Sequence, residues 1–454
     1  MADNIYYGLQ ILLSRRKYTS GNLSKLFNFF GVILISISYF HLIPIMATQS
    51  IIESLRFLLV ECTSASYKSD ISLTFLHKTC ALAQNVIKNE NARQKNRRFF
   101  TPVLSFLNEF VKIHGATFET IISTKQLSAG DTESASNPTE EDKTMYRCID
   151  SLAHETIKAI TSLNLLGSDW ISVQAPQGNG QSASETKCRQ PLPHKSATFC
   201  SSGLAPFFSF LRTCTIECPA FLLHILAFEG PESHDDESAD DGPGLLVFRK
   251  ALETAVSSII DVEGEISICA MSFLESVTSL AEKANANNTE TSDSSITLPT
   301  KNAAIQRVAG EYNLAFQTSM LSILLRGSCG MLQPYVVPDA CRLLVHALSK
   351  SHLSEQEFKA IVKRGLSQDI FFLGNRARCV VFDFCLPLLG RSNNNAAATT
   401  ATTAPSLESM ESMITDVWRL HRFEDVDMIE RSDAVHAFCL RYGRRNPSAT
   451  STSL

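Results

Sequence analysis

Two cysteines four residues apart come closest, in this sequence, to a reactive or metal-binding pair. Cys214 and Cys218, in the stretch CTIEC, fall on one face of a predicted helix, because residues four apart are neighbours on a helix surface. That spacing suits a metal site or a redox pair, but a four-ligand metal site needs a second Cys or His pair, and none follows nearby. We therefore predict that both thiols pack in the core as small apolar groups.

The histidines give no stronger indication of a catalytic or metal-binding site. His114, His154, His224 and His346 each stand alone on a predicted helix, whereas a catalytic site needs a histidine beside a carboxylate and a nucleophile. The sequence has no GxxxxGK[ST], HExxH or GxSxG motif, and no GxGxxG that opens a helix. We predict that the chain is not an enzyme and that it uses no cofactor and no metal.

One short basic run could hold a partner. The stretch RQKNRR lies between two predicted helices and contributes Arg93, Lys95, Arg97 and Arg98 as candidate protein-binding residues. Arginine forks bind phosphates and carboxylates through two parallel hydrogen bonds, so an acidic or phosphorylated segment would suit this run. The alternative is a solvated corner between helices, which is what charge runs usually are.

Composition sets the broad class. The 454 residues include 41 Lys and Arg against 46 Asp and Glu, so the net charge of −5 gives no footprint of direct nucleic-acid binding. Apolar residues make up 44% and charged residues 19%, which indicates a folded chain with a large core. The 13 cysteines are scattered and form no CxxC pair, which indicates a reducing, intracellular compartment.

Helical periodicity runs through most of the chain, and the alternation typical of strands is nearly absent. In residues 101–115, Thr101 is a candidate cap, Pro102 fits the first turn, and Gly115 is expected to end the helix. The sequence therefore predicts an all-α fold. Further helices are predicted over 48–65, 70–87, 145–163, 204–217, 245–260, 265–280, 303–325, 338–349 and 354–363.

Polar tracts interrupt this series of helices. The tract 229–243, for example, has seven acidic residues and no Lys or Arg, and such tracts contain too few apolar groups to offset the entropy of ordering. Short helices that cannot bury their own apolar stripes must stack on neighbours, so we predict an α-solenoid of HEAT- or ARM-like repeats over 47–391 with disordered insertions. The insertions are placed near 128–142, 174–196, 229–243 and 285–300, with a linker at 392–406 and short helices and a tail over 407–454.

The amino-terminal residues 1–46 form an apolar extension. Residues 26–46 contain no Asp, Glu, Lys or Arg and follow Arg15, Arg16, Lys17 and Lys25, which is the outline of a membrane anchor. Polar residues within the run dilute it, and a buried helix is the alternative. Our preferred interpretation does not place this segment in a membrane.

Three stretches go beyond a generic helical repeat. Residues 204–223 read LAPFFSFLRTCTIECPAFLL, residues 261–277 read DVEGEISICAMSFLESV, and residues 324–348 contain Pro-Tyr-x-x-Pro-Asp at Pro334 to Asp339. In the last of these, Pro334 should stop one helix and Pro338 should start the next. Together these stretches, over roughly 204–363, resemble the carboxy-terminal HEAT repeats of the importin-β superfamily, most closely the transportin-SR type.

The resemblance implies a non-catalytic α-solenoid that carries protein cargo, among it Ser/Arg-rich nuclear proteins, past nuclear pore proteins, with Ran in its GTP form controlling cargo release. It also implies localisation in nucleus and cytoplasm. Family members are about twice this length, and the amino-terminal repeats that bind Ran have no match here, so the chain is expected to be the cargo-side half of a receptor, an incomplete gene model or a divergent relative. The alternatives are a HEAT-repeat scaffold that does not transport and a membrane-anchored helical protein.

Overall fold

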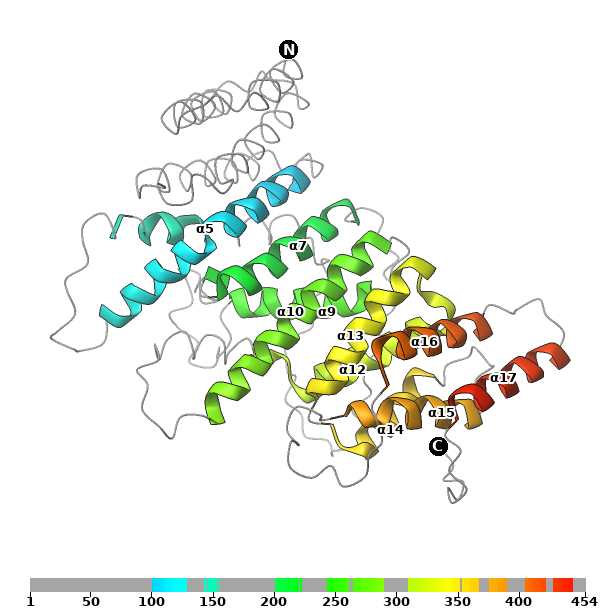
Figure 1. Cartoon of the computed structure of the whole chain (residues 1–454). Helices are drawn as coiled ribbons and strands as arrows, with labels where there is room; N and C mark the ends of the chain where they lie inside the picture. The colour runs from blue at the N-terminus through cyan, green and yellow to red at the C-terminus, as the bar shows by residue number, and fades with distance from the viewer. Residues whose placement is uncertain are drawn as a thin grey trace, which may run out of the picture. The chain divides into compact units, whose positions relative to one another are not determined.

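The part of the chain that the computed structural model describes is all-α, with no strand among its residues (Figure 1). The prediction of an all-α protein is confirmed for this part. Residues 1–99, with candidate helices 48–65 and 70–87 and the run of residues 26–46, lie outside it. The described residues are 100–128, 143–144, 146–152, 154, 201–219, 221–222, 243–260, 264–289, 309–351, 353–366, 375–389, 405–421 and 428–443.

The chain divides into two compact units. The first comprises Met1–Ala251 and Asp293–Ile305, and the second comprises Leu252–Ser292 and Gln306–Leu454. Helix α9 (Pro243–Ser258) spans the division between them.

In the first unit, helix α5 (Phe100–Ser128) packs along helix α7 (Ser201–Glu217). Gly115 does not end α5 as predicted, because the helix continues for 13 residues beyond it. A Cβ atom at this position would lie 3.0 Å from Cβ of Glu217 and 3.3 Å from Cβ of Cys218. The glycine therefore serves the close approach of the two segments rather than a helix stop.

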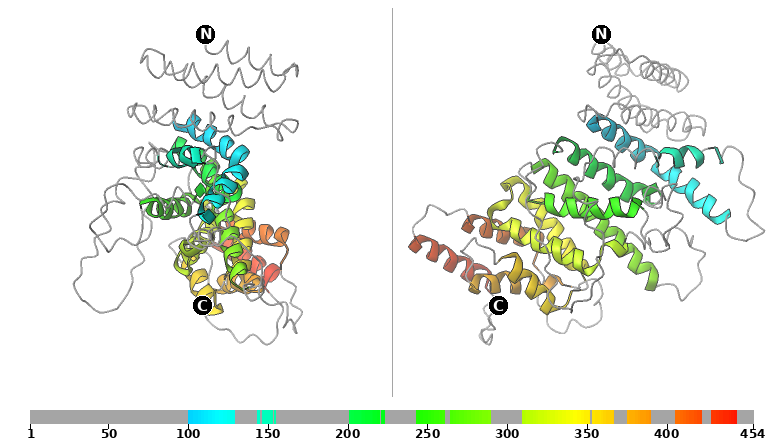
Figure 2. Two further views of the ribbon diagram at one scale, coloured as in Figure 1. Left: turned by 90° about the vertical axis from the view of Figure 1, so that its left-hand side faces the viewer. Right: turned by 180° about the vertical axis from the view of Figure 1, so that it is seen from behind.

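The second unit contains seven longer helices among its described residues, and their contacts form two rows. In one row α13 packs on both α10 and α16, and in the other α12 packs on α14, α14 on α15, and α15 on α17. Figure 1 shows α10, α13 and α16 as neighbours, and Figure 2 shows the same helices from behind. Their bounds are α10 Gly264–Thr289, α12 Leu314–Arg326, α13 Val337–Lys350, α14 Glu355–Gly365, α15 Asn375–Cys385, α16 Leu407–His421 and α17 Met428–Tyr442.

Helix α13 lies at the centre of the first row. It has Pro338 in its first turn, where the missing N–H leaves no hydrogen bond unmade. Asp339 lies in the first turn and Lys350 in the last turn, which are the ends that the helix dipole favours for these charges. Its apolar residues recur at helical spacing and are buried between neighbouring helices. The buried residues are Val337, Ala340, Cys341, Leu343, Leu344, Ala347 and Leu348.

The corner before α13 differs in detail from the prediction. The preceding helix stops at Arg326, and the π-helical turn Gly327–Met331 follows, so the chain turns before it reaches Pro334. Gly330 has φ 88°, which is the left-handed region where a side chain would add strain. Pro334 then begins the short 3₁₀ helix Pro334–Val336, with a preset φ that suits a first position.

Two predicted helix boundaries differ from those of the structure. Residues 303–325 were expected to form one helix, but the side chain of Asn313 accepts a hydrogen bond from the Phe316 N–H at 3.0 Å and starts α12 at Leu314. Residues 285–300 were expected to be an insertion, but α10 continues to Thr289. By contrast, Ser354 forms a capping box with Glu357 at the start of α14, where the sequence placed a helix start.

Gly365, the last residue of α14, is expected to be intolerant of a side chain. A Cβ there would lie 2.9 Å from Cβ of Leu325 and 3.0 Å from the backbone oxygen of Ser322, and both atoms are fixed by α12. We expect Gly365→Ala to lower the free energy of unfolding by about 1–2 kcal/mol, because the overpacking outweighs the better helix propensity of alanine. Thermal unfolding followed by circular dichroism would measure it.

Gly310→Ala is the matched control, since a Cβ at Gly310 would meet no atom within 4 Å. Its melting temperature should be unchanged or slightly raised. Equal melting temperatures for both variants would show that α14 and α12 do not approach as closely as described.

Candidate functional site

The basic run predicted to bind a partner lies outside the described residues. Arg93, Lys95, Arg97 and Arg98 all precede Phe100, where the description begins. Their role in binding stays a prediction.

The two cysteines of CTIEC occupy the core of the first unit. Both side chains are fully buried, as predicted for packing residues. Burial raises the pKa of both the Cys214 and the Cys218 thiols far above their ordinary value, so both remain protonated and poor as nucleophiles or metal ligands. Among the described residues, no group of three or more His, Cys, Asp or Glu side chains is arranged to hold a metal ion.

His114 is a core residue of α5. Its ring is 1% exposed and lies 5.0 Å from the ring centroid of Phe110 and 6.3 Å from that of Phe118. Burial lowers its pKa from 6.5 to about 4, because the apolar surroundings disfavour the imidazolium form. The side chain is therefore neutral near neutral pH.

The arrangement that most resembles a catalytic group lies between α10 and α13. His346 Nε2 is 3.2 Å from Ser279 Oγ, and Glu275 and Glu282 act electrostatically on the imidazole. The Ser279 hydroxyl, however, donates to the backbone oxygen of Glu275 at 3.0 Å, so it accepts the hydrogen of Nε2 instead of giving a proton to it. Glu282 pairs with Lys350.

These contacts position helices rather than activate a nucleophile. Ser279 contacts His346, and Glu282 contacts Lys350. The residue numbers of the paired positions increase together in both helices, so α10 and α13 run parallel. Burial lowers the pKa of His346, while the two glutamates oppose this effect and Lys350 adds to it. A neutral histidine that donates to Ser279 fits a stable contact between neighbouring helices.

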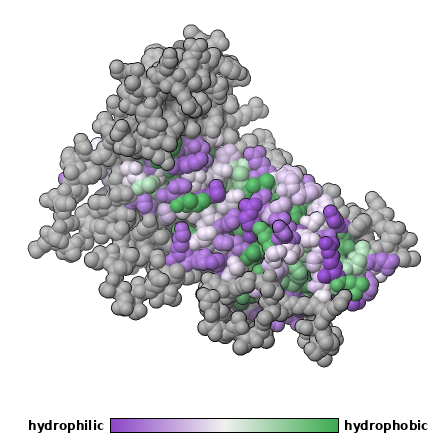
Figure 3. Space-filling model, in the orientation of Figure 1, coloured by the Kyte–Doolittle hydropathy of each residue, from purple (hydrophilic) through white to green (hydrophobic). Residues whose placement is uncertain are grey.

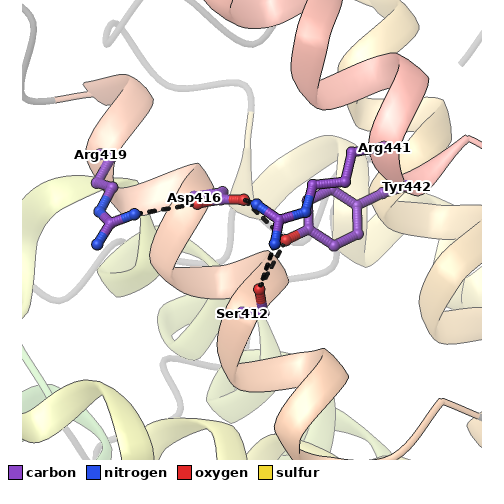
Figure 4. A network of polar contacts seen from close by, with 5 residues as sticks. All are labelled: Ser412, Asp416, Arg419, Arg441 and Tyr442. Carbon is purple, nitrogen blue, oxygen red and sulfur yellow. Dashed lines mark hydrogen bonds and ion pairs between the residues drawn. The ribbon is translucent and has the colours of Figure 1, made fainter.

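A second polar cluster joins α16 and α17 (Figure 4). Asp416 on α16 accepts hydrogen bonds at Oδ2 from Tyr442 Oη at 2.7 Å and from Arg441 Nη1 at 2.9 Å, both on α17. Ser412, one turn before Asp416, lies 3.0 Å from Tyr442 Oη and 3.5 Å from Arg441 Nη2. Arg419 of α16 itself reaches Oδ1 of Asp416 at 3.5 Å.

Sequence reasoning missed this cluster. Ser412, Asp416 and Arg419 follow at helical spacing on one face of α16, and this is the one signal that the sequence carries. Their partners Arg441 and Tyr442 come 25 and 26 residues after Asp416, and nothing in the sequence pairs these positions.

The corner before α13 presents exposed apolar side chains. Tyr335 is 62% exposed and Met331 is 37% exposed. The Tyr335 hydroxyl nevertheless approaches Gly264 so closely that a Cβ added there would clash with it. Trp418 of α16 donates from Nε1 to the backbone oxygen of Leu332 at 2.9 Å and fixes this corner to α16. Aromatic residues and methionine are enriched in protein interfaces, so the corner is a candidate contact surface.

The described part of the surface seen in Figure 3 is mixed in polarity. On the face shown in Figure 3, polar and apolar residues of the described part alternate without merging into one large apolar area. None of the described helices is both long enough and apolar enough to cross a bilayer.

Comparison with protein-family models, with curated proteins and with solved structures finds no match to this chain.

Proposed function

We propose that the chain is an α-solenoid transport receptor of the importin-β type, or the cargo-side half of one, that carries protein cargo between cytoplasm and nucleus. The observation that carries the proposal is the two-row packing in the second unit, where each helix contacts the next helix of its own row. The rows are joined by contacts of α12 with α13 and of α16 with α17. Stacking of successive helices in rows is the packing expected of a solenoid, in which each repeat contacts its neighbours. The resemblance of residues 204–363 to the carboxy-terminal repeats of that superfamily adds the transport function.

The mechanism would rest on surface area rather than on a single pocket. A row of helices offers many weak contacts to an extended partner, and several weak contacts on one chain combine into strong binding. Because each repeat touches only its neighbours, small changes at successive contacts add up to a bend of the whole array. Ran in its GTP form would release cargo by favouring a curvature that the cargo does not fit.

A capture experiment tests the transport function. The full chain, immobilised, would be offered nuclear extract with excess Ran locked in its GTP form, and Ran loaded with GDP would be the matched control. We expect nuclear proteins, Ser/Arg-rich ones among them, to be retained with Ran-GDP and mostly released with Ran-GTP. Retention that is the same with both forms would contradict a Ran-controlled receptor.

A scaffold that assembles other proteins is the second candidate. It rests on the same helix packing and on the exposed corner at Met331 and Tyr335, and it needs neither Ran nor nuclear pores. Partners that bind with equal strength in the presence of either form of Ran would favour a scaffold, or a receptor half that lacks the Ran-binding repeats. A membrane-anchored helical protein, the third interpretation, depends on residues 26–46, and membrane association that is lost when residues 1–46 are deleted would be required for it.

A further inference from the structure

Among its described side chains, those of residues 432–442, helix α17 buries little apolar surface. Of its residues 432–442, Phe438 and Cys439 are buried, while Asp433, His436 and Leu440 are exposed. By comparison, α13 buries seven of its 14 residues. Since burial of apolar side chains supplies most of the stability of a packed helix, we expect residues 432–442 of α17 to be held less firmly than α13.

Arg441 and Tyr442, at the end of α17, add polar contacts that lie close to solvent. The side chain of Arg441 is 62% exposed and that of Asp416 is 19% exposed, so their ion pair is screened by salt. The Tyr442 hydroxyl donates to the same carboxylate at 2.7 Å, and this hydrogen bond is strengthened by the charge of its acceptor. Asp416 thus accepts hydrogen bonds from both Arg441 and Tyr442 of α17.

We propose that α17 is a reversibly docked helix, which a polar latch of Ser412, Asp416, Arg441 and Tyr442 holds against α15 and α16. When the latch opens, the helix separates while the rest of the second unit stays folded. This inference stands on the contacts of α17 alone and does not depend on the transport function.

Opening would uncover side chains of α15 and of α17 itself. The ring of Tyr442 packs edge-on against Phe384 of α15, with centroids 5.5 Å apart. A Cβ added at Gly443, the residue after α17, would lie 3.7 Å from Cγ2 of Val380. Cys439, 5% exposed in the docked state, would become accessible to thiol reagents. Local opening of this kind has a small free energy wherever few apolar contacts are lost.

Thiol labelling of Cys439 measures the opening directly. The full chain would be treated with N-ethylmaleimide, and modification of the peptide that contains Cys439 would be followed over time by mass spectrometry. Asp416→Asn removes the charge that both α17 donors bind, so we expect labelling of Cys439 to accelerate roughly tenfold. Tyr442→Phe removes one donor and should accelerate it by about threefold.

Arg419→Ala is the matched control, because Arg419 pairs with Asp416 within α16 and does not touch α17 through this bond. It should leave the labelling rate of Cys439 unchanged. Raising salt from about 0.05 M to about 0.5 M should accelerate labelling of the wild-type chain more than that of Asp416→Asn.

Hydrogen exchange in the same samples separates local opening from unfolding. Exchange of α17 amides should accelerate in Asp416→Asn and Tyr442→Phe, while exchange of α13 amides stays slow. Three outcomes would overturn the proposal. These are an unchanged Cys439 rate in Asp416→Asn, an acceleration that α13 shares in full, or an equal acceleration in Arg419→Ala.

Discussion

Leu344→Asp will abolish the cooperative unfolding transition of the second unit at ordinary temperatures. Leu344 is 1% exposed and lies on α13, which packs against both α10 and α16. Truncating a buried leucine costs about 3–5 kcal/mol, and burying an unpaired carboxylate adds several more. The sum is comparable with the whole stability of a typical domain, which is about 5–15 kcal/mol.

Circular dichroism during heating would show the loss as a missing or much lower transition. Pro338→Ala is the control on the same helix: Pro338 is exposed in the first turn, where its preset φ helps but is not required. We expect that variant to melt within a few degrees of the wild type, with a loss of roughly 1 kcal/mol or less in the free energy of unfolding. A Leu344→Asp variant that melts like the wild type would mean that this face of α13 is not buried.

Acidification will destabilise the first unit through His114. The folded pKa of this histidine is about 4, against 6.5 for an unperturbed side chain, so the folded state binds fewer protons than the unfolded state between these values. The folded protein therefore has its full stability, as far as His114 is concerned, above about pH 6.5, and this contribution is lost as pH falls towards about 4. A difference of about 2.5 pKa units corresponds to about 3 kcal/mol.

The variant His114→Leu isolates this effect from the titration of carboxylates in the same range. Urea unfolding of the wild type and the variant at about pH 7 and about pH 4 should show the variant gaining about 3 kcal/mol relative to the wild type at the lower pH. His436→Leu is the control, because this ring on α17 is exposed in the folded protein. A stability difference between wild type and His114→Leu that does not change with pH would show that His114 is solvated in the folded state.

Helices were predictable where one residue carries a strong local signal. The helix predicted over 354–363 corresponds to α14, which Ser354 caps together with Glu357, and Pro338 indicated the start of α13. Capping and proline geometry depend on neighbouring residues alone. The all-α class followed from periodicity in the same way.

One error arose because a residue acts over a distance, and another because a local cap was overlooked. Gly115 looks like a helix stop, but its lack of a side chain is needed for the approach of Glu217 and Cys218, which are about a hundred residues away. Asn313 lies inside the single helix predicted over 303–325, but its side chain accepts a hydrogen bond from the Phe316 N–H and so starts a new helix at Leu314.

The cluster around Asp416 could not have been predicted in full. Helical spacing places Ser412 and Asp416 on one face, but which later helix supplies their partners depends on the packing of α17 on α16. The pairing of Ser279 with His346 was out of reach for the same reason, since 67 residues separate them.

The bond from Trp418 to the carbonyl of Leu332 has a consequence for the growing polypeptide on the ribosome. The corner that contains Leu332 is synthesised 86 residues before the indole that binds it. At a synthesis rate of about 5–20 residues per second, Trp418 is added roughly 4–17 s after Leu332, and until then the Leu332 carbonyl can bond only to water or to other groups. Helices α10 to α14 can pair during that interval, but α16 has to emerge before the corner takes its final form, so the second unit matures from its first helices towards its last.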